Sequence, residues 1–157
     1  MNNYANKYNS ATKKILARAR DIDMHIKYEE PYSLYNIVYA MRELFKDQKF
    51  RDKFAVNDDK NWSRGMCALS SIAVNILGGK EYQIMAISPK DWDLGPLIFV
   101  KTLYDNKPFH VTDGQVFLGH KIPYNLAFPI DASKVKTPNK IEFVNAVINK
   151  IKEISND

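Results

Sequence analysis

The stretch NWSRGMCALSSIAVNILGG, residues 61–79, decides how this chain is expected to fold. From Cys67, the only cysteine, to Leu77 it is apolar on most sides, which is typical of a buried helix. Gly78 and Gly79 follow, and glycine ends helices because it adopts the left-handed cap conformation at little cost. The sequence therefore predicts a buried helix that begins beside a lone thiol.

Two more helices are predicted on the N-terminal side. Apolar residues recur at three-to-four spacing between Ser10 and Tyr28, and again from Leu34 towards Phe54, so each set lines one helix face. Ser33 is a suitable N-cap for the second helix, since its hydroxyl can accept a hydrogen bond from a first-turn N–H. The two apolar stripes consist of Ile15, Ala19, Ile22 and Ile26, and of Leu34, Ile37, Val38, Met41, Leu44 and Phe45.

The pattern changes to that of strands after residue 79. Residues 82–88, 96–104 and 108–116 are β-rich and separated by turn residues, and the Asp-Asn-Lys sequence at 105–107 predicts a hairpin turn. Residues 126–130 contain a proline, which cannot donate a ladder hydrogen bond, and therefore favour a short edge strand. We expect a small antiparallel sheet.

A last helix is predicted from Thr137, an N-cap followed by a proline in the first helical position. Helices, then a small sheet, then a helix are typical of an α+β fold. We expect one domain over residues 1–157, with a helical part in 1–54, the cysteine helix and sheet in 62–131, and the final helix in 137–155. The apolar stripe of the predicted final helix consists of Ile141, Val144, Ile148, Ile151 and Ile154.

The composition is that of an ordinary globular domain, with 45% hydrophobic and 26% charged residues among 157. One cysteine excludes an internal disulfide and a thiolate-rich zinc site, and no spacing of histidines and carboxylates favours a metal. No phosphate-binding loop or other cofactor motif is present. The polar N-terminus lacks a signal-like apolar core, and no apolar run is long enough to span a membrane. We therefore expect a cytoplasmic protein without a cofactor.

The charge of +5 is unevenly distributed. Lys13, Lys14, Arg18 and Arg20 lie in the first predicted helix, ahead of its first acid, Asp21. A basic helix can contact nucleic-acid phosphates, although such charges more often form a solvated face. These four residues are candidate binding residues, with nucleic acid as the less favoured partner.

Cys67 is the candidate nucleophile. A helix N-terminus stabilises a thiolate, because backbone N–H groups and the helix dipole favour negative charge there. Gly65 lets the preceding loop bend, and backbone N–H groups of this turn around Met66 can form an oxyanion hole. The alternative is that Cys67 is a small buried hydrophobe, the commonest role of a free cysteine.

His110 is the candidate base, since it lies on a predicted strand that can face the cysteine helix. Asp113 or Gln115 can orient its ring. Alternation places His110 and Asp113 on opposite strand faces, which weakens a strict triad unless the strand bends near Gly114. A structural role for the histidine is the alternative.

Two segments resemble the YunG-like bacterial proteins. WSRGMCALSSIAVNILGG, residues 62–79, is similar to their cysteine-helix segment, which runs Gly-x-Cys-Ala into an apolar helix ending in Gly-Gly. YDNKPFHVTDGQV, residues 104–116, resembles their hairpin of the form Asp-Gly-x-x-x-Asp-Leu-Thr-x-x-Gln. Both also resemble the wider transglutaminase-like and papain-like folds, in which a helix cysteine faces a histidine and an acid on neighbouring strands. The resemblance implies that fold and a cysteine-dependent activity.

The sequence departs from the family pattern at two positions. Thr112 and Gln115 fall on the family's threonine and glutamine, but His110 falls where the family has its aspartate. The family's histidine falls near Ile98, an apolar residue. Either the site is rearranged, with Cys67 paired to His110, or the scaffold has lost its chemistry and kept its shape.

Two functions of different classes follow. The first is a cysteine-dependent acyl-transfer enzyme, such as an amidase, peptidase, deamidase or transglutaminase-like protein, whose thiolate attacks an amide carbonyl. The alternative is a catalytically inactive scaffold that binds a protein as an inhibitor or accessory protein, of the kind found in phages and mobile elements. Trp62 and Trp92, in loops flanking the cysteine helix, are candidate binding residues. We expect a protein or peptide partner and no membrane.

Overall fold

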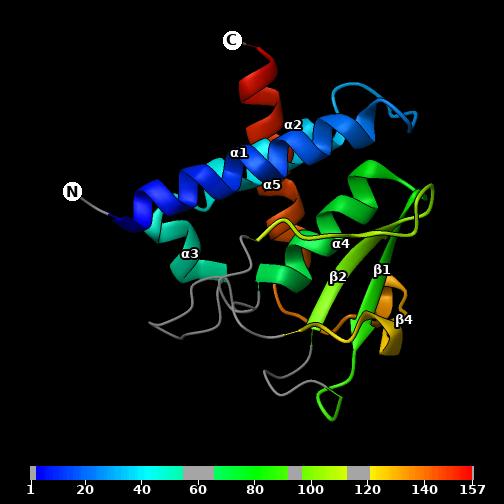
Figure 1. The fold of residues 1–157 in the computed structure, drawn as a ribbon. Coiled ribbons are helices and arrows are strands. Elements are labelled where there is room, and N and C mark those ends of the chain that lie inside the picture. Colours follow the sequence, from blue (N-terminus) through cyan, green and yellow to red (C-terminus); the bar gives the residue numbers. More distant parts are fainter. Residues whose placement is uncertain (1–2, 55–65, 92–96, 113–120, 157) are drawn as a thin grey trace.

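The computed structural model describes residues 3–54, 66–91, 97–112 and 121–156. Within them the chain forms five α-helices and a four-stranded antiparallel sheet, so the predicted α+β class is confirmed (Figure 1). The helices are α1 (Asn3–Asp23), α2 (Leu34–Leu44), α3 (Gln48–Phe54), α4 (Met66–Gly78) and α5 (Lys140–Ser155), and the strands are β1 (Tyr82–Ile87), β2 (Leu97–Thr102), β3 (Pro108–Phe109) and β4 (Phe128–Pro129).

The sheet has the order β3-β2-β1-β4. β1 and β2 pair along their whole length, from Tyr82 opposite Thr102 to Ile87 opposite Leu97. β4 pairs with the other side of β1, which confirms the predicted edge strand. Residue Asn106 has φ 57°, a left-handed conformation that asparagine tolerates, and lies in the predicted hairpin turn between β2 and β3.

Alternating side chains of the strands separate two apolar clusters. The face towards α4 contributes Ile84, Val100 and Phe109 to the large core shared with the helices. The opposite face holds a smaller cluster that is covered by the segment around Ile122 and Ala127. The strand residues of this smaller cluster are Met85, Ile87, Leu97 and Phe99. The face of the sheet on which a strand side chain lies therefore decides which of the two clusters it joins.

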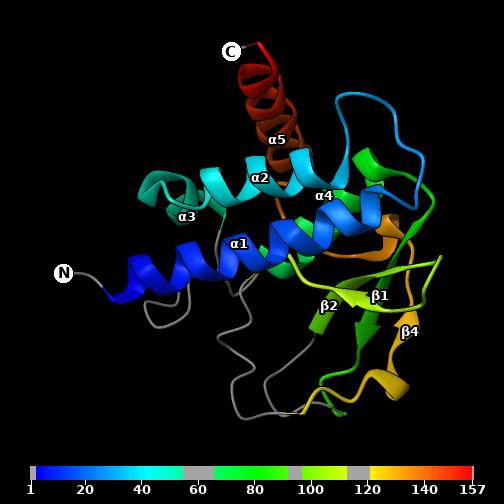
Figure 2. The same cartoon turned by 45° about the horizontal axis from the view of Figure 1, so that its top comes forward.

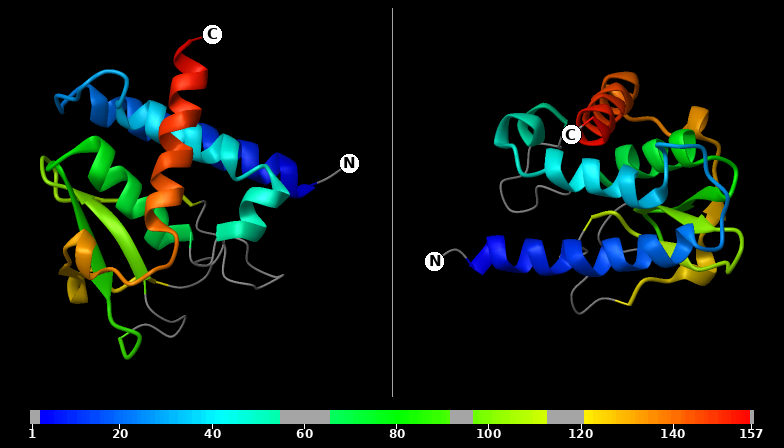
Figure 3. Two further views of the ribbon diagram at one scale, coloured as in Figure 1. Left: turned by 180° about the vertical axis from the view of Figure 1, so that it is seen from behind. Right: turned by 90° about the horizontal axis from the view of Figure 1, so that it is seen from above.

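The helices form a layer over the α4 side of the sheet. α2 is central, because it contacts α1, α4 and α5. Figure 2 shows α1 and α2 side by side, and Figure 3 shows α5 crossing α2. Ser33 caps α2 as predicted, since its Oγ accepts from the N–H of Asn36 at 3.1 Å. Asp23, at the end of α1, adds a second cap by accepting from the N–H groups of Leu34 and Tyr35 at 2.8 and 3.0 Å.

Arg42 of α2 is completely buried and ties three segments together. Its Nε donates to Thr12 Oγ1 at 2.8 Å, and its Nη atoms donate to the carbonyl oxygens of Tyr8 and Val111 at 3.1 and 3.3 Å. Its guanidinium carbon lies 3.8 Å from the centre of the Tyr8 ring. Thr12 and Tyr8 belong to α1 and Val111 follows β3, so this one side chain links both helices to the edge of the sheet.

Three element boundaries differ from the prediction. The first helix begins at Asn3 rather than near Ser10, and the second helical stretch is interrupted between Leu44 and Gln48. The predicted N-cap at Thr137 is wrong, because α5 begins at Lys140. Pro138 and Asn139 form a turn before it, in which Asn139 has φ 64°, so the proline does not start the helix.

Candidate functional site

Cys67 is the second residue of α4, at the start of the helix as predicted, and lies against β2. The residue as a whole is half-buried, while its sulfur is enclosed enough that burial raises the pKa of the thiol. The backbone N–H groups of Ile98, Ala68 and Cys67 itself favour the thiolate and act in the opposite direction, without offsetting burial. The thiol is therefore protonated at neutral pH.

His110 follows β3 and is held among aromatic side chains. Its ring centre lies 5.5 Å from that of Phe99, and its Nε2 is 2.8 Å from the hydroxyl oxygen of Tyr124. Burial lowers the pKa of His110 to about 4. The imidazole is thus neutral at pH 7 and bound to a phenol.

The structure does not bring Cys67 and His110 together, because they lie on opposite faces of the sheet. Phe109 pairs with Val100, and both side chains belong to the core under α4. The next residue, His110, therefore lies on the other face, beside Phe99 of the smaller cluster. The alternation of side chains from Phe109 to His110 thus turns the imidazole away from the helix that carries the thiol.

Ile98 occupies the position beside the thiol at which the resemblance places the family's histidine. Its backbone N–H contacts the sulfur of Cys67, and its side chain packs against the large core. No side chain at this position can act as a base, since isoleucine has no titratable group.

Several predicted site residues lie outside the described residues, namely Trp62, Gly65, Trp92, Asp113 and Gln115. Met66, the other predicted residue of the oxyanion turn, is the first residue of α4, and its side chain is completely buried in the core. Of the predicted catalytic group, only Cys67 and His110 can therefore be placed.

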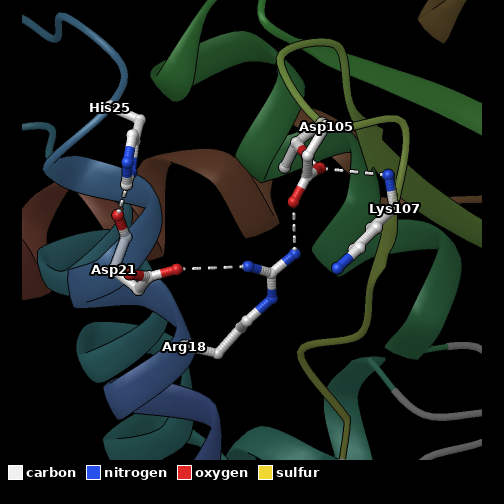
Figure 4. A network of polar contacts seen from close by, with 6 residues as sticks. Arg18, Asp21, His25, Asp105 and Lys107 are labelled. Carbon is white, nitrogen blue, oxygen red and sulfur yellow. Dashed lines mark hydrogen bonds and ion pairs between the residues drawn. The ribbon is translucent and has the colours of Figure 1, made fainter.

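The four predicted binding cations are not equivalent. Arg18 turns towards the β2–β3 turn, where its Nη2 is 2.9 Å from Asp105 Oδ2, and it also reaches Asp21 at 3.5 Å (Figure 4). Burial would raise the pKa of Asp105, but hydrogen bonds from Thr102, Arg18 and the Lys107 N–H lower it to about 2. Arg18 is therefore a structural residue that ties α1 to the hairpin.

The other three cations are exposed. The Arg20 guanidinium carbon lies 4.4 Å from the centre of the Tyr35 ring on α2, whereas Lys13 and Lys14 extend from α1 into solvent. Close to the hairpin, the exposed ring of His25 stacks on Tyr104 with centres 5.1 Å apart.

A groove of about 290 Å³ between α4, the 3-10 turn Ala132–Lys134 and α5 was not predicted. Ile72 and Val144 lie at its buried side, whereas Ile76 and Ile141 are 54% and 78% exposed. Ile141 was predicted to lie in the apolar stripe of the last helix, but it is exposed and lines this groove. Lys140 Nζ donates to the carbonyl oxygens of Ala132 and Val135 at 3.3 and 2.8 Å, which holds it at this groove.

Among the residues that the structure describes, no group of histidine, cysteine, aspartate and glutamate side chains can hold a metal ion. None of the described helices is both long and apolar enough to cross a membrane. No family model matches the chain, and no curated protein or solved structure matches it either. The likeness to YunG-like and papain-like proteins therefore stays a prediction.

Proposed function

We propose that this protein is a non-catalytic binding protein, an inhibitor or accessory protein built on a papain-like arrangement of helix and sheet. The observation that carries the proposal is the separation of Cys67 from His110 by the sheet. A general base must lie within about 3 Å of the group it deprotonates, or one water away. A base and a nucleophile on opposite faces of a sheet cannot meet this requirement.

The protonation states of both groups support the same conclusion. A thiol attacks an amide carbonyl as the thiolate, and burial raises the pKa of Cys67. His110, with a pKa of about 4, is a weak base, because its surroundings disfavour the protonated ring. In cysteine proteases the pKa of the thiol is lowered, and the histidine is basic enough to accept the thiol proton. The acyl-transfer enzyme is therefore the less supported hypothesis.

The packing of α4 on the sheet supports binding without chemistry. α4, which carries Cys67 in its first turn, packs on β2, the strand on which the resemblance places a histidine, and Ile98 stands in place of that base. Close packing of α4 on β2 holds the side chains on the outer side of α4 in fixed positions, as a binding surface requires. The groove between α4 and α5 suits a helix of a partner protein, with apolar residues over Ile76 and Ile141 and a carboxylate facing Lys140.

The reactivity of Cys67 tests this proposal. We expect iodoacetamide to alkylate the native protein at pH 7 at least about 10-fold more slowly than glutathione, because a thiol with a raised pKa holds little thiolate. Cys67→Ser gives the background rate, and the urea-unfolded protein gives the rate of the exposed thiol. A plateau of fast alkylation that begins below pH 7 would overturn the proposal in favour of the enzyme.

Affinity capture from the source cells tests the binding itself. Wild type and Cys67→Ala are expected to retain the same stoichiometric partner, while Ile141→Glu places a charge on the groove and loses it. Met24→Glu is the matched control, since Met24 is equally exposed, at 81%, and does not line the groove. Loss of the partner with Cys67→Ala alone would indicate a role for the thiol and contradict the proposal.

A further inference from the structure

A basic and aromatic surface covers the two N-terminal helices, and neither the thiol nor the groove belongs to it. We call it the α1–α2 face, and it consists of Lys7, Lys13, Lys14 and Arg20 of α1 and Tyr35 and Tyr39 of α2. α1 carries no acidic residue before Asp21. Its length of about 30 Å, at 1.5 Å per residue, makes this an extended surface.

The four cations are arranged in two rows on the outer side of α1. Lys13 and Arg20 are seven residues apart, as are Lys7 and Lys14, so each row places two charges about 10 Å apart along the helix. All four side chains are exposed, whereas Ala19 on the inner side is completely buried. Because the rows are offset by one residue, about 100° around the helix, both face solvent but flank the outer side of α1, with Lys13 and Arg20 on the row towards α2.

The charge of this face is not compensated locally. Within the described part of the chain, no carboxylate forms an ion pair with any of its four cations. The acids of the two helices are engaged elsewhere: Asp21 pairs with Arg18, Asp23 accepts from the backbone N–H groups of Leu34 and Tyr35, and Glu43 pairs with Lys46 at 2.5 Å. A ligand with closely spaced negative charges thus meets an unopposed positive potential.

Arg20, Tyr35 and Tyr39 form a stacked array at one end of the face. The guanidinium of Arg20 lies 4.4 Å from the Tyr35 ring centre, and the rings of Tyr35 and Tyr39 are 6.1 Å apart with planes inclined by 11°. Both tyrosines are partly exposed. Arg20 is held by an aromatic ring and not by a carboxylate. Its positive charge is therefore not neutralised, and its N–H groups can donate to a phosphate.

We propose that the α1–α2 face binds single-stranded nucleic acid. Its lysines and Arg20 contact phosphates, and an unpaired base stacks on the exposed part of the tyrosine array. Cationic rows combined with partly exposed aromatic rings are the features that single-strand binding surfaces use. A duplex, an acidic protein or an anionic membrane offers the charge but no unpaired bases for the array.

Fluorescence anisotropy with a fluorescein-labelled 20-nucleotide oligo(dT) and the whole protein tests the proposal. Four phosphate contacts predict a slope of log K against log salt of about −3, so that affinity falls roughly 50-fold between 50 and 200 mM NaCl. Lys13→Gln with Lys14→Gln removes two contacts and is expected to reduce the slope by about half. These exposed positions tolerate glutamine, so folding is not at risk.

Lys134→Gln with Lys136→Gln is the matched control, because it removes the same charge at exposed positions outside the face. The control is expected to change the affinity less than about 2-fold and to leave the slope intact. Equal losses in both double variants, or no binding at 50 mM NaCl, would overturn the proposal. Both outcomes leave the proposed binding of a partner protein in the groove between α4 and α5 unaffected, because the α1–α2 face does not include that groove.

Tyr39→Leu separates nucleic acid from other polyanions. Loss of one base–ring stack is expected to weaken oligo(dT) binding about 10-fold, while binding of heparin, which has no bases, is unchanged. A thermal melt confirms that the variant is folded. Equal effects on both ligands, or stronger binding of polyglutamate or anionic lipid vesicles than of oligo(dT), would show a different class of partner and reject the proposal.

Discussion

At the scale of single residues, the environment of His110 is decisive. The ring lies between Phe99 and Tyr124, and this burial lowers its pKa to about 4, well below the value of about 6.5 for an exposed imidazole. A neutral imidazole that donates to or accepts from a phenol stabilises the smaller apolar cluster.

This shift predicts how stability depends on pH. Because the folded pKa is lowered, the unfolded state binds a proton first as the pH falls, so the contribution of His110 is complete above pH 6.5 and is lost by about pH 4. The loss is at most about 3.5 kcal/mol, at about 1.4 kcal/mol per pKa unit. Urea unfolding of wild type and His110→Gln between pH 7.5 and 4 measures it. Identical pH profiles of the two proteins would contradict the prediction.

At the scale of elements, the end of α4 depends on close packing as well as on backbone freedom. Gly79 has φ 97°, which confirms that a glycine ends this helix in the left-handed conformation. Gly78 is needed for another reason, since a Cβ at this position would lie 2.7 Å from Cδ2 and Cε2 of Tyr82. Tyr82 is 1% exposed and its ring cannot move into solvent.

Gly78→Ala is therefore expected to destabilise the protein by about 1–3 kcal/mol, the usual cost of overpacking a core. The measurement is the free energy of unfolding in urea. Gly79→Asn serves as the control, because a side chain there meets no atom within 4 Å and asparagine tolerates a positive φ, so its cost stays below about 1 kcal/mol. A larger loss for the control would show that backbone strain, rather than Tyr82, dominates this turn.

At the scale of the whole molecule, the helical layer is attached to the sheet at two ends. Arg18 and Asp105 link α1 to the β2–β3 turn at the surface, whereas Arg42 links α1, α2 and the segment after β3 in the interior. The surface ion pair is partly exposed and contributes little, because water screens it. The buried guanidinium matters more, since its removal leaves buried carbonyl groups without their donor.

Arg42→Met is expected to lower the free energy of unfolding by at least about 3 kcal/mol, because the carbonyl groups of Tyr8 and Val111 lose hydrogen bonds from a charged donor. Hydrogen exchange should show the largest loss of protection in α1. Lys49→Met, a surface change on α3, is expected to have an effect below about 0.5 kcal/mol. If the amides of α1 exchange as slowly in Arg42→Met as in the wild type, apolar packing alone holds this helix and the prediction is wrong.

Features that depend on neighbours along the chain were predictable from the sequence alone. The α+β class, the Ser33 cap, the glycine end of α4 and the edge strand at Pro129 all follow from local spacing and backbone preferences. The start of α5 was missed, because the turn at Pro138 and Asn139 competes locally with a proline-initiated helix. Arg42 was also missed, although its spacing of four from Val38 and three from Phe45 places it on the buried stripe.

What the tertiary structure alone decided is the side of the sheet on which each chemical group lies. The sequence established a thiol at a helix start and an imidazole on a strand, but a shift of one residue in strand register reverses every side chain. The pairing of Phe109 with Val100 sends His110 to the face of Phe99, away from Cys67. Register and helix packing arise from contacts between distant segments, so no local pattern encodes whether the two groups meet.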